Sequence, residues 1–177
     1  MNGVSSNESQ EGTATMSTAI QATPTEEEPP LFPYDRYEAR IEEISAEYAA
    51  NTPVPHMFFP DFLDESVAQQ MAAEFPDHDD DTWIQYKHVN ENKAGLHVRE
   101  ALPDLIGRVI DELNSPACVS LISKITGIEG LIADPTIEGG GMHQASRGGY
   151  LNVHTDFTMH RQIPHWRRRV NLILYLN

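Results

Sequence analysis

His154 and Asp156 stand one residue apart in the stretch GGYLNVHTDF, and both side chains can bind a metal ion. In an extended strand, alternate side chains lie on one face, so the two Cα atoms would be roughly 6 to 7 Å apart. Tyr150 and Asn152 would lie on the same face. A neutral imidazole and a carboxylate suit Fe(II), Mn(II) or Zn(II). The pattern therefore predicts that His154 and Asp156 share one ion.

A second His-x-Asp pair, His78 and Asp80, occurs earlier in the chain. Short motifs of this kind arise by chance, so the two copies have to be separated by their surroundings. The earlier copy lies in an acidic run just after Pro76 and has no alternating apolar face, which is typical of a solvated loop. Only the copy at His154 has the alternation of a strand.

The spacing of apolar residues predicts four helices before residue 127. The first runs from Tyr34 to just before Pro53, with apolar residues at steps of three and four. The second begins after Asp64, a plausible N-cap, and is stopped by Pro76. The third and fourth cover about residues 103–114 and 115–126. These helices would pack against the strand that contains His154 and Asp156.

Strands are predicted around residues 57–59 and 83–90, and glycine-rich β structure is predicted after residue 127. The stretch 150–156 and the last eight residues, VNLILYLN, both alternate. In the last stretch one face is apolar and the other includes Asn171 and Tyr175. Strands with one apolar and one polar face suit a jelly roll whose polar face lines a site. The expected fold class is α+β, with a jelly-roll barrel that packs on helices.

The chain has 177 residues and a formal net charge of −15, which argues against nucleic acid as a partner. The arginine run 167–169, with Arg161 nearby, is a local exception. It is interpreted as a solvated or partner-paired patch, or as a loop over the site mouth that favours an acidic partner; the alternative is that Arg168 pairs with acidic residues of the same chain. Residues 1–30 contain no Lys or Arg and few large apolar residues, so a disordered acidic tail is expected there.

The chain contains one cysteine, Cys118, so no intrachain disulfide is possible. We interpret Cys118 as a small buried hydrophobe beside Val119 and Leu121. No run of about 18 apolar residues exists, and residues near the N-terminus lack a basic and apolar signal pattern. The sequence therefore predicts a cytoplasmic protein without a membrane span.

Three stretches resemble the prolyl 4-hydroxylase-like branch of the 2-oxoglutarate- and Fe(II)-dependent dioxygenases. They are FFPDFLD, GGGMHQASRGGYLNVHTDF and RRRVNLILYLN, and the resemblance covers about residues 52–177. It implies a double-stranded β-helix (jelly roll) with N-terminal supporting helices. It also implies that His154 and Asp156 bind Fe(2+), that 2-oxoglutarate and O2 are co-substrates, and that ascorbate is a candidate reductant. The implied reaction hydroxylates a C–H bond of a small-molecule or peptidyl substrate, prolyl or otherwise amino-acid-like, with release of succinate and CO2.

The same resemblance implies a set of co-substrate residues. Tyr175 stands where these enzymes often place a tyrosine that binds the distal carboxylate of 2-oxoglutarate, and Asn171 shares its strand face. Tyr150 lies four residues before His154, whereas the family tyrosine lies three before it, at the position that Leu151 holds here. Asn152 is a candidate donor behind His154. The alternative for Tyr150 and Asn152 is an ordinary strand residue.

The family also uses a second histidine, some tens of residues past the His-x-Asp pair, and then an arginine or lysine that anchors 2-oxoglutarate. Only 21 residues follow Asp156. His160 and His165 lie in a loop-like stretch and are interpreted as substrate-side or structural residues. We therefore expect residues 31–177 to be the N-terminal and central part of an oxygenase domain, a fragment that is incomplete at its C-terminus and inactive alone.

Two other classes of function remain open. In the first, the chain is a non-catalytic jelly-roll binding module in which His154 and Asp156 are structural. In the second, it is a cupin-type metalloprotein that uses no 2-oxoglutarate. The identity of the substrate and the oligomeric state are not readable from the sequence.

Overall fold

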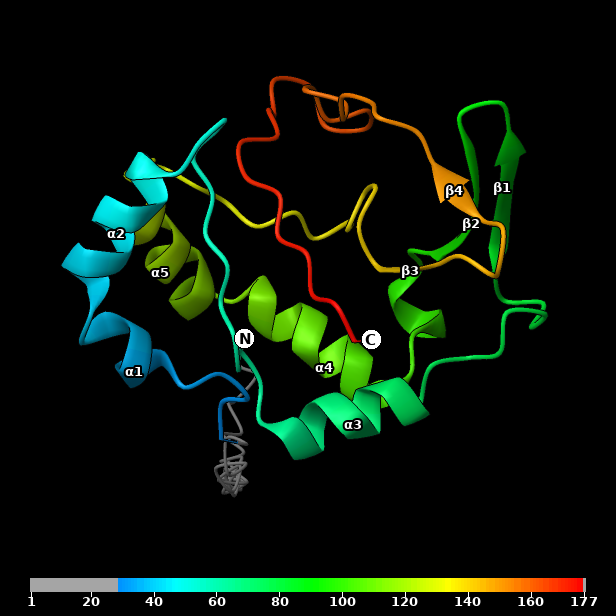
Figure 1. The fold of residues 1–177 in the computed structure, drawn as a ribbon, viewed down its shortest axis with the longest axis horizontal. Helices are drawn as coiled ribbons and strands as arrows, with labels where there is room; N and C mark the ends of the chain where they lie inside the picture. The colour runs from blue at the N-terminus through cyan, green and yellow to red at the C-terminus, as the bar shows by residue number, and fades with distance from the viewer. Residues whose placement is uncertain (1–28, 177) are drawn as a thin grey trace, which may run out of the picture.

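A computed structural model describes residues 29–176, which form helices and one antiparallel sheet (Figure 1). The predicted α+β class is confirmed at this level. The predicted tail of residues 1–30 lies outside the described residues, apart from Pro29 and Pro30, which are exposed. Within the described part, no helix is both long and apolar enough to span a bilayer.

The first predicted helix is divided into α1 (Tyr34–Glu38) and α2 (Ile41–Ala50). The break lies at Arg40, whose φ of −121° and ψ of 20° depart from helical values. Both short helices contact α5, and Tyr37 and Ile44 are buried in the same cluster as Leu121 of α5. The prediction of one continuous helix was wrong because the turn at Arg40 lets both pieces pack on one partner.

The other three helices lie close to their predicted positions. They are α3 (Glu65–Ala73), α4 (Asp104–Leu113) and α5 (Pro116–Thr126). Asp64 is the N-cap residue of α3, but its side chain makes no capping bond. α5 has clear ends: Ser115 Oγ accepts a hydrogen bond from the Cys118 amide at 3.2 Å, and Gly127 ends the helix with a φ of 68°.

The sheet is built around its longest strand, β2 (Glu91–Leu96). β2 pairs antiparallel with β1 (Ile84–His88), β3 (Met142–Gln144) and β4 (Tyr150–Leu151). A 3-10 turn, η1 (Arg99–Ala101), connects β2 to α4. β4 ends three residues before His154, so its pairing with β2 fixes the position of the chain that leads to the candidate metal pair.

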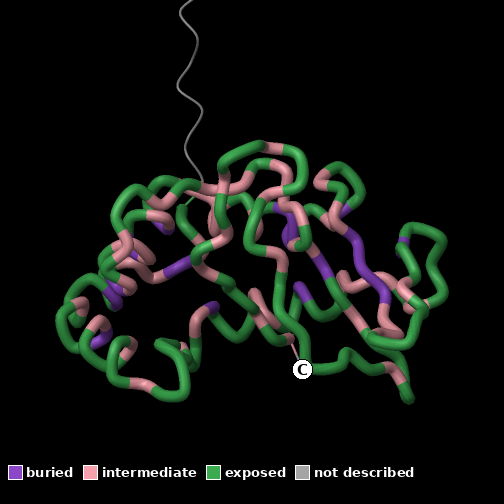
Figure 2. The backbone as a smooth tube through the Cα atoms, turned by 90° about the horizontal axis from the view of Figure 1, so that it is seen from above, coloured by how far each residue is buried: buried purple, intermediate pink, exposed green. Residues whose placement is uncertain are grey.

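Two apolar clusters hold these elements together, and both are visible as buried segments in Figure 2. The larger joins α3, α4 and the sheet through residues such as Met71, Ile106, Val109 and Leu96. The smaller lies between α1, α2 and α5. Cys118 is 1% exposed, so the interpretation of a buried hydrophobe is confirmed.

Three predicted strands differ from the structure. Residues 57–59 and 170–176 have no regular secondary structure, and of the predicted strand 150–156 only Tyr150 and Leu151 belong to the sheet. In the segment 170–176 the alternation is still present in part, because Leu174 and Leu176 pack on the larger cluster while Tyr175 is 72% exposed. Alternation sets the facing of side chains, but a strand also needs a neighbour for its hydrogen bonds, and none lies beside this segment within residues 29–176.

Replacing Ile106 by alanine should destabilise the protein by about 2 to 5 kcal/mol, because the side chain is 3% exposed in the larger cluster and the change leaves a cavity. Urea unfolding gives this free energy. The matched control is Ile132→Ala, at a position that is 62% exposed, which should change it by less than about 0.5 kcal/mol. Equal effects of the two substitutions would contradict the assigned core.

Burial raises the pKa of the Cys118 thiol to about 11, so little thiolate exists in the folded protein near pH 8. We expect a thiol reagent to modify native Cys118 slowly at that pH and the urea-unfolded chain quickly. The rate of modification, followed by absorbance, measures the difference. Rapid modification of the native protein would show that this thiol is not buried in the folded state.

Candidate metal centre

His154 and Asp156 converge although they follow the end of β4 and lie in irregular chain. His154 Nε2 is 3.3 Å from Asp156 Oδ1, and the two side chains are 46% and 41% exposed. Two ligand bonds of the usual length to one ion place their donor atoms about 3 to 3.5 Å apart. The observed separation therefore fits two ligands of one metal ion.

The other nitrogen of His154 fixes how the ring is presented. Nδ1 is 2.8 Å from the backbone carbonyl oxygen of Asn152, which can only accept, so Nδ1 carries the proton and donates. Nε2 is the ring nitrogen that faces Asp156, so it is the one that would bind a metal. A backbone carbonyl in this position is a frequent means of orienting a metal-binding histidine.

Arg168 holds the second oxygen of Asp156. Its Nη1 is 2.8 Å from Asp156 Oδ2, and Asn171 donates to the same oxygen at 3.4 Å. The guanidinium also lies 4.2 Å from the centre of the Phe157 ring and donates from Nη2 to the Glu138 carbonyl oxygen at 3.3 Å. These contacts leave Oδ1 as the oxygen that faces His154.

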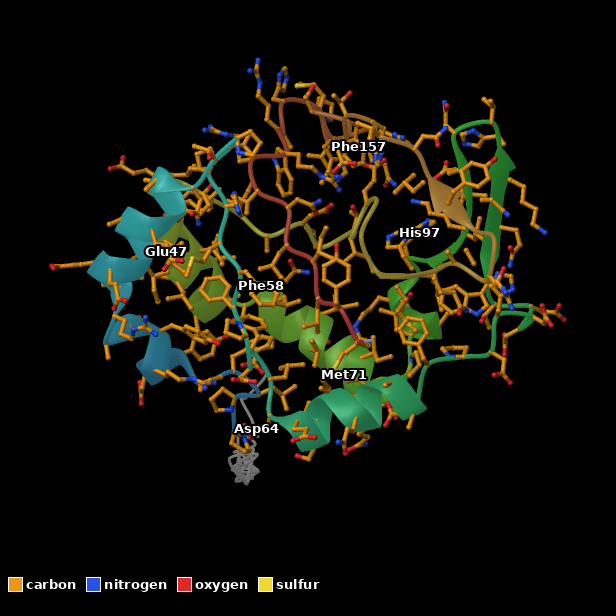
Figure 3. All side chains as sticks on the ribbon, in the orientation of Figure 1. Glu47, Phe58, Asp64, Met71, His97 and Phe157 are labelled. Carbon is orange, nitrogen blue, oxygen red and sulfur yellow. The ribbon has the colours of Figure 1, made fainter. Side chains whose placement is uncertain are left out.

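Gly139 makes the approach of Phe157 possible. A Cβ at position 139 would lie 2.7 Å from the Phe157 ring and 3.2 Å from Arg168 Nη2, and its φ is 67°. Both facts favour glycine at this position. Phe157 lies far from Met71 of α3 in Figure 3, so the candidate metal centre is distant from α3, whereas Ile137, two residues before Gly139, packs on the larger cluster.

His160 is not available as a third ligand, because both ring nitrogens have protein partners. Nδ1 accepts from the backbone amides of Gln162 and Ile163 at 3.1 and 2.9 Å, and Nε2 lies 3.3 Å from Asp134 Oδ2. The side chain is 7% exposed. Of the two roles expected for His160, the contacts favour the structural one. His165 is exposed in the same loop, with a φ of 73°.

Asp134 is the acidic partner of this loop. Burial alone would raise the pKa of its carboxyl group, but hydrogen bonds from Thr136, from the Glu138 amide and from His160 outweigh burial and lower it. Asp134 therefore stays ionised at neutral pH. It holds the segment that precedes Gly139 against the loop that follows Asp156.

The second His-x-Asp pair does not converge. His78 Nδ1 is 3.4 Å from Asp79 Oδ1, whereas Asp80 Oδ1 accepts from the amide and hydroxyl of Thr82 at 2.8 and 2.7 Å. Each side chain thus bonds to a different neighbour. The interpretation of this copy as a loop is confirmed.

The predicted co-substrate residues have different surroundings. The Tyr150 hydroxyl donates to the His88 carbonyl at 2.9 Å, and Asn152 Nδ2 donates to the Val89 carbonyl at 3.1 Å. These bonds tie β4 and the residue after it to the end of β1 and the β1–β2 turn, which favours a structural role for each side chain. Asn171 contacts Asp156, as above. The Tyr175 hydroxyl is exposed and makes no hydrogen bond among residues 29–176.

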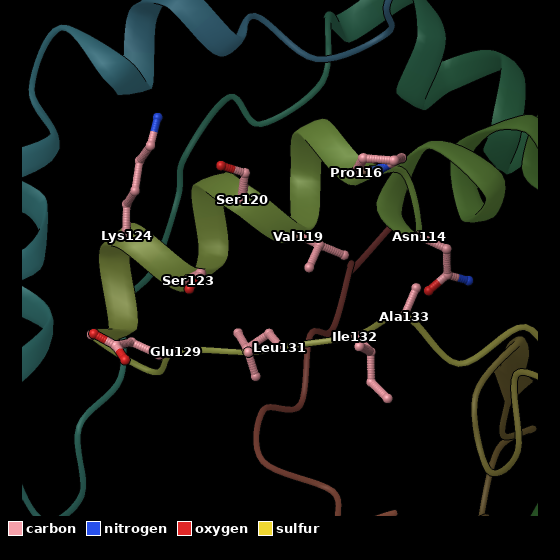
Figure 4. A pocket seen from close by; sticks show the side chains of 12 residues that line it. Asn114, Pro116, Val119, Ser120, Ser123, Lys124, Glu129, Leu131, Ile132 and Ala133 are labelled. Carbon is pink, nitrogen blue, oxygen red and sulfur yellow. The ribbon is translucent and has the colours of Figure 1, made fainter.

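A third ligand is missing from the part of the chain that the structure describes, since residues 29–176 contain no group of three or more His, Cys, Asp or Glu side chains placed to hold a metal. A shallow depression of about 650 Å³ lies elsewhere, between α5 and residues 129–133 (Figure 4). Its lining includes Lys124 and Glu129 but neither His154 nor Asp156. The His154–Asp156 pair, not this depression, has the chemistry of a site.

The alternative that Arg168 pairs with an acidic residue of the same chain agrees with its contact to Asp156, but the sequence did not name that partner. Neither the inward direction of Arg168 nor the contacts of His160 with Asp134 could be read from spacing, because the partners are 12 to 30 residues apart and lie in irregular chain. Comparisons of this chain with family models, curated proteins and solved structures gave no significant match.

His160→Ala should lower the free energy of unfolding by about 1 to 3 kcal/mol, because it leaves two backbone amides and Asp134 without their partner. His165→Ala, an exposed position in the same loop, is the control and should change it by less than about 0.5 kcal/mol. Chemical unfolding of both variants measures the difference. An equal stability of the two variants would remove the structural role from His160.

Proposed function

We propose that this protein is a 2-oxoglutarate- and Fe(II)-dependent dioxygenase that hydroxylates a C–H bond of a prolyl or other amino-acid-like substrate. The observation that carries the proposal is the convergence of His154 Nε2 and Asp156 Oδ1 at 3.3 Å. One imidazole and one carboxylate are two members of the two-His-one-carboxylate set of non-haem Fe(II) oxygenases. The likeness of the three sequence stretches to that family supports the same function.

The roles of the chain's own residues follow from their contacts. His154 and Asp156 would hold the iron, the Asn152 carbonyl would orient the imidazole, and Arg168 would orient the carboxylate. Iron with 2-oxoglutarate and O2 supplies the hydroxylation chemistry, with succinate and CO2 as products and ascorbate as a candidate reductant. Residues 29–176 supply two of the three protein ligands, so binding by this chain alone is expected to be weak.

The proposal extends to the fold and the co-substrate. We propose that residues 170–176 belong to a jelly-roll strand, since Leu174 and Leu176 face the core and Tyr175 faces outward. The free hydroxyl of Tyr175 is the candidate donor to 2-oxoglutarate. A cytoplasmic location is part of the same proposal, because the single cysteine is buried and reduced.

One observation favours the non-catalytic alternative. The charge of Asp156 is already balanced by Arg168, so the pair could persist as a structural contact without a metal. A cupin-type metalloprotein is the other alternative, and it would bind metal without 2-oxoglutarate. The non-catalytic alternative predicts no metal binding by the pair. The cupin-type alternative predicts metal binding that does not respond to 2-oxoglutarate.

Titration of the chain with Co(II), a spectroscopic substitute for Fe(II), tests the metal pair. We expect His154→Ala and Asp156→Ala each to weaken binding at least tenfold, because each removes one of only two protein ligands. The matched controls are His78→Ala and Asp80→Ala, which make the same changes in the pair that does not converge and should leave the affinity within twofold.

Unchanged affinity in the His154 and Asp156 variants, or an equal loss in the His78 and Asp80 variants, would contradict the metal role. Dependence on 2-oxoglutarate is read separately, as a change in the Co(II) spectrum when 2-oxoglutarate is added. A bound metal whose spectrum ignores 2-oxoglutarate would favour the cupin-type alternative.

A further inference from the structure

We infer that Arg161, Arg167 and Arg169, which we call the basic face, form a docking surface for an acidic peptide segment. These side chains belong to the loop that follows Asp156. The loop lies along one edge of the molecule, away from α3 and α4 (Figure 1). Four of the 12 Lys and Arg residues of the chain fall within residues 161–169.

The directions of three consecutive arginines create this surface. Arg168 turns inward to Asp156 and is 21% exposed, and its two neighbours are exposed. Arg167 and Arg169 have no ion pair within residues 29–176. Arg161 is 73% exposed; its guanidinium lies 3.7 Å from Glu138 and 5.2 Å from the centre of the Phe157 ring, and most of it remains open to solvent. The guanidinium groups are therefore available to a partner.

The backbone beneath the basic face is held in place. His160 donates its amide to the Trp166 carbonyl at 3.0 Å, Arg168 donates its amide to the Thr158 carbonyl at 3.0 Å, and a β-bridge joins Met159 to Arg167. The Arg161 amide donates to Glu138 Oε2 at 3.0 Å. A surface fixed before binding loses less conformational entropy when a ligand docks.

Charge selects the partner. The formal net charge of −15 repels an acidic ligand over most of the surface, and several other basic side chains are neutralised by neighbours, as in the Arg40–Glu43, Arg99–Asp111 and Lys124–Glu38 pairs. Guanidinium groups bind carboxylates through two parallel hydrogen bonds. A nucleic acid needs a broad basic surface, which an acidic chain lacks, whereas a short acidic peptide needs only a few arginines.

The basic face lies next to the candidate metal centre. Arg168 lies between Arg167 and Arg169 and reaches Asp156, so a peptide bound there passes close to the candidate metal centre. Its role as a substrate, with carboxylates a few residues from the hydroxylated position, rests on the proposed function. Docking itself does not, because it needs no metal.

Fluorescence anisotropy with a labelled ten-residue peptide that contains six glutamates, measured without metal at low salt, tests this inference. The double variant Arg167→Gln, Arg169→Gln should raise the Kd at least fivefold. The control Lys87→Gln, Arg147→Gln removes the same charge from exposed positions outside the loop and should stay within twofold. His154→Ala should bind the peptide like the unaltered chain, so a failure of docking is distinct from a failure of the metal proposal.

Three results would overturn the inference. The first is that the Arg167, Arg169 variant binds the peptide with unchanged Kd. The second is an equal loss in the Lys87, Arg147 control, which would mean that net charge alone matters. The third is that a single-stranded oligonucleotide of equal charge binds more tightly than the peptide, which would assign the basic face to nucleic acid.

Discussion

The contact between Arg168 and Asp156 is the interaction on which the candidate metal centre depends. One guanidinium joins the carboxylate, the Phe157 ring and the Glu138 carbonyl, and so links three segments that have no regular secondary structure. Because Arg168 holds Oδ2, the other oxygen of Asp156 remains directed at His154. The same contact turns Arg167 and Arg169 outward. The orientation of Asp156 toward His154 and the outward direction of the neighbouring arginines therefore both depend on the Arg168–Asp156 contact.

The rest of the fold restrains the ends of this arrangement. The chain reaches His154 from β4, where Tyr150 and Asn152 bond to carbonyl groups of the β1–β2 turn. It leaves Asp156 through a loop that His160 fixes by bonds to Gln162 and Ile163. The helices and the two apolar clusters supply the stability that such irregular segments lack. Polar contacts thus set the positions of His154 and Asp156, and the apolar clusters stabilise the elements that make those contacts.

Local signals predicted the helices well and the strands poorly. The position of α5 follows from Ser115, Pro116 and Gly127, which act within the helix itself. Strands depend on partners that are distant in sequence, so alternation at residues 170–176 predicted the facing of Leu174 and Leu176 but not a hydrogen-bonded ladder. The break at Arg40 was also missed, since it results from packing of two helices on α5.

The metal pair itself was predictable, because an i, i+2 spacing brings two side chains together in any extended chain. Its surroundings were not. Pairing of Arg168 within the chain was one alternative from the sequence, but its partner Asp156 and the partners of His160 are set by folding. Asn152 was predicted as a donor through its side chain, whereas its backbone carbonyl contacts His154. Spacing thus gave the two candidate ligands, and only the three-dimensional structure gave the contacts that orient their side chains.

The central claim is that His154 Nε2 and Asp156 hold a metal ion together. Nitrogen NMR of the histidine rings, recorded before and after addition of Zn(II), tests it most directly because it reports each ring nitrogen separately. The account predicts that His154 Nε2 shifts while its Nδ1 stays protonated, and that the rings of His78 and His160 do not change. A metal-induced shift at His78 or His160, with His154 unaffected, would contradict it.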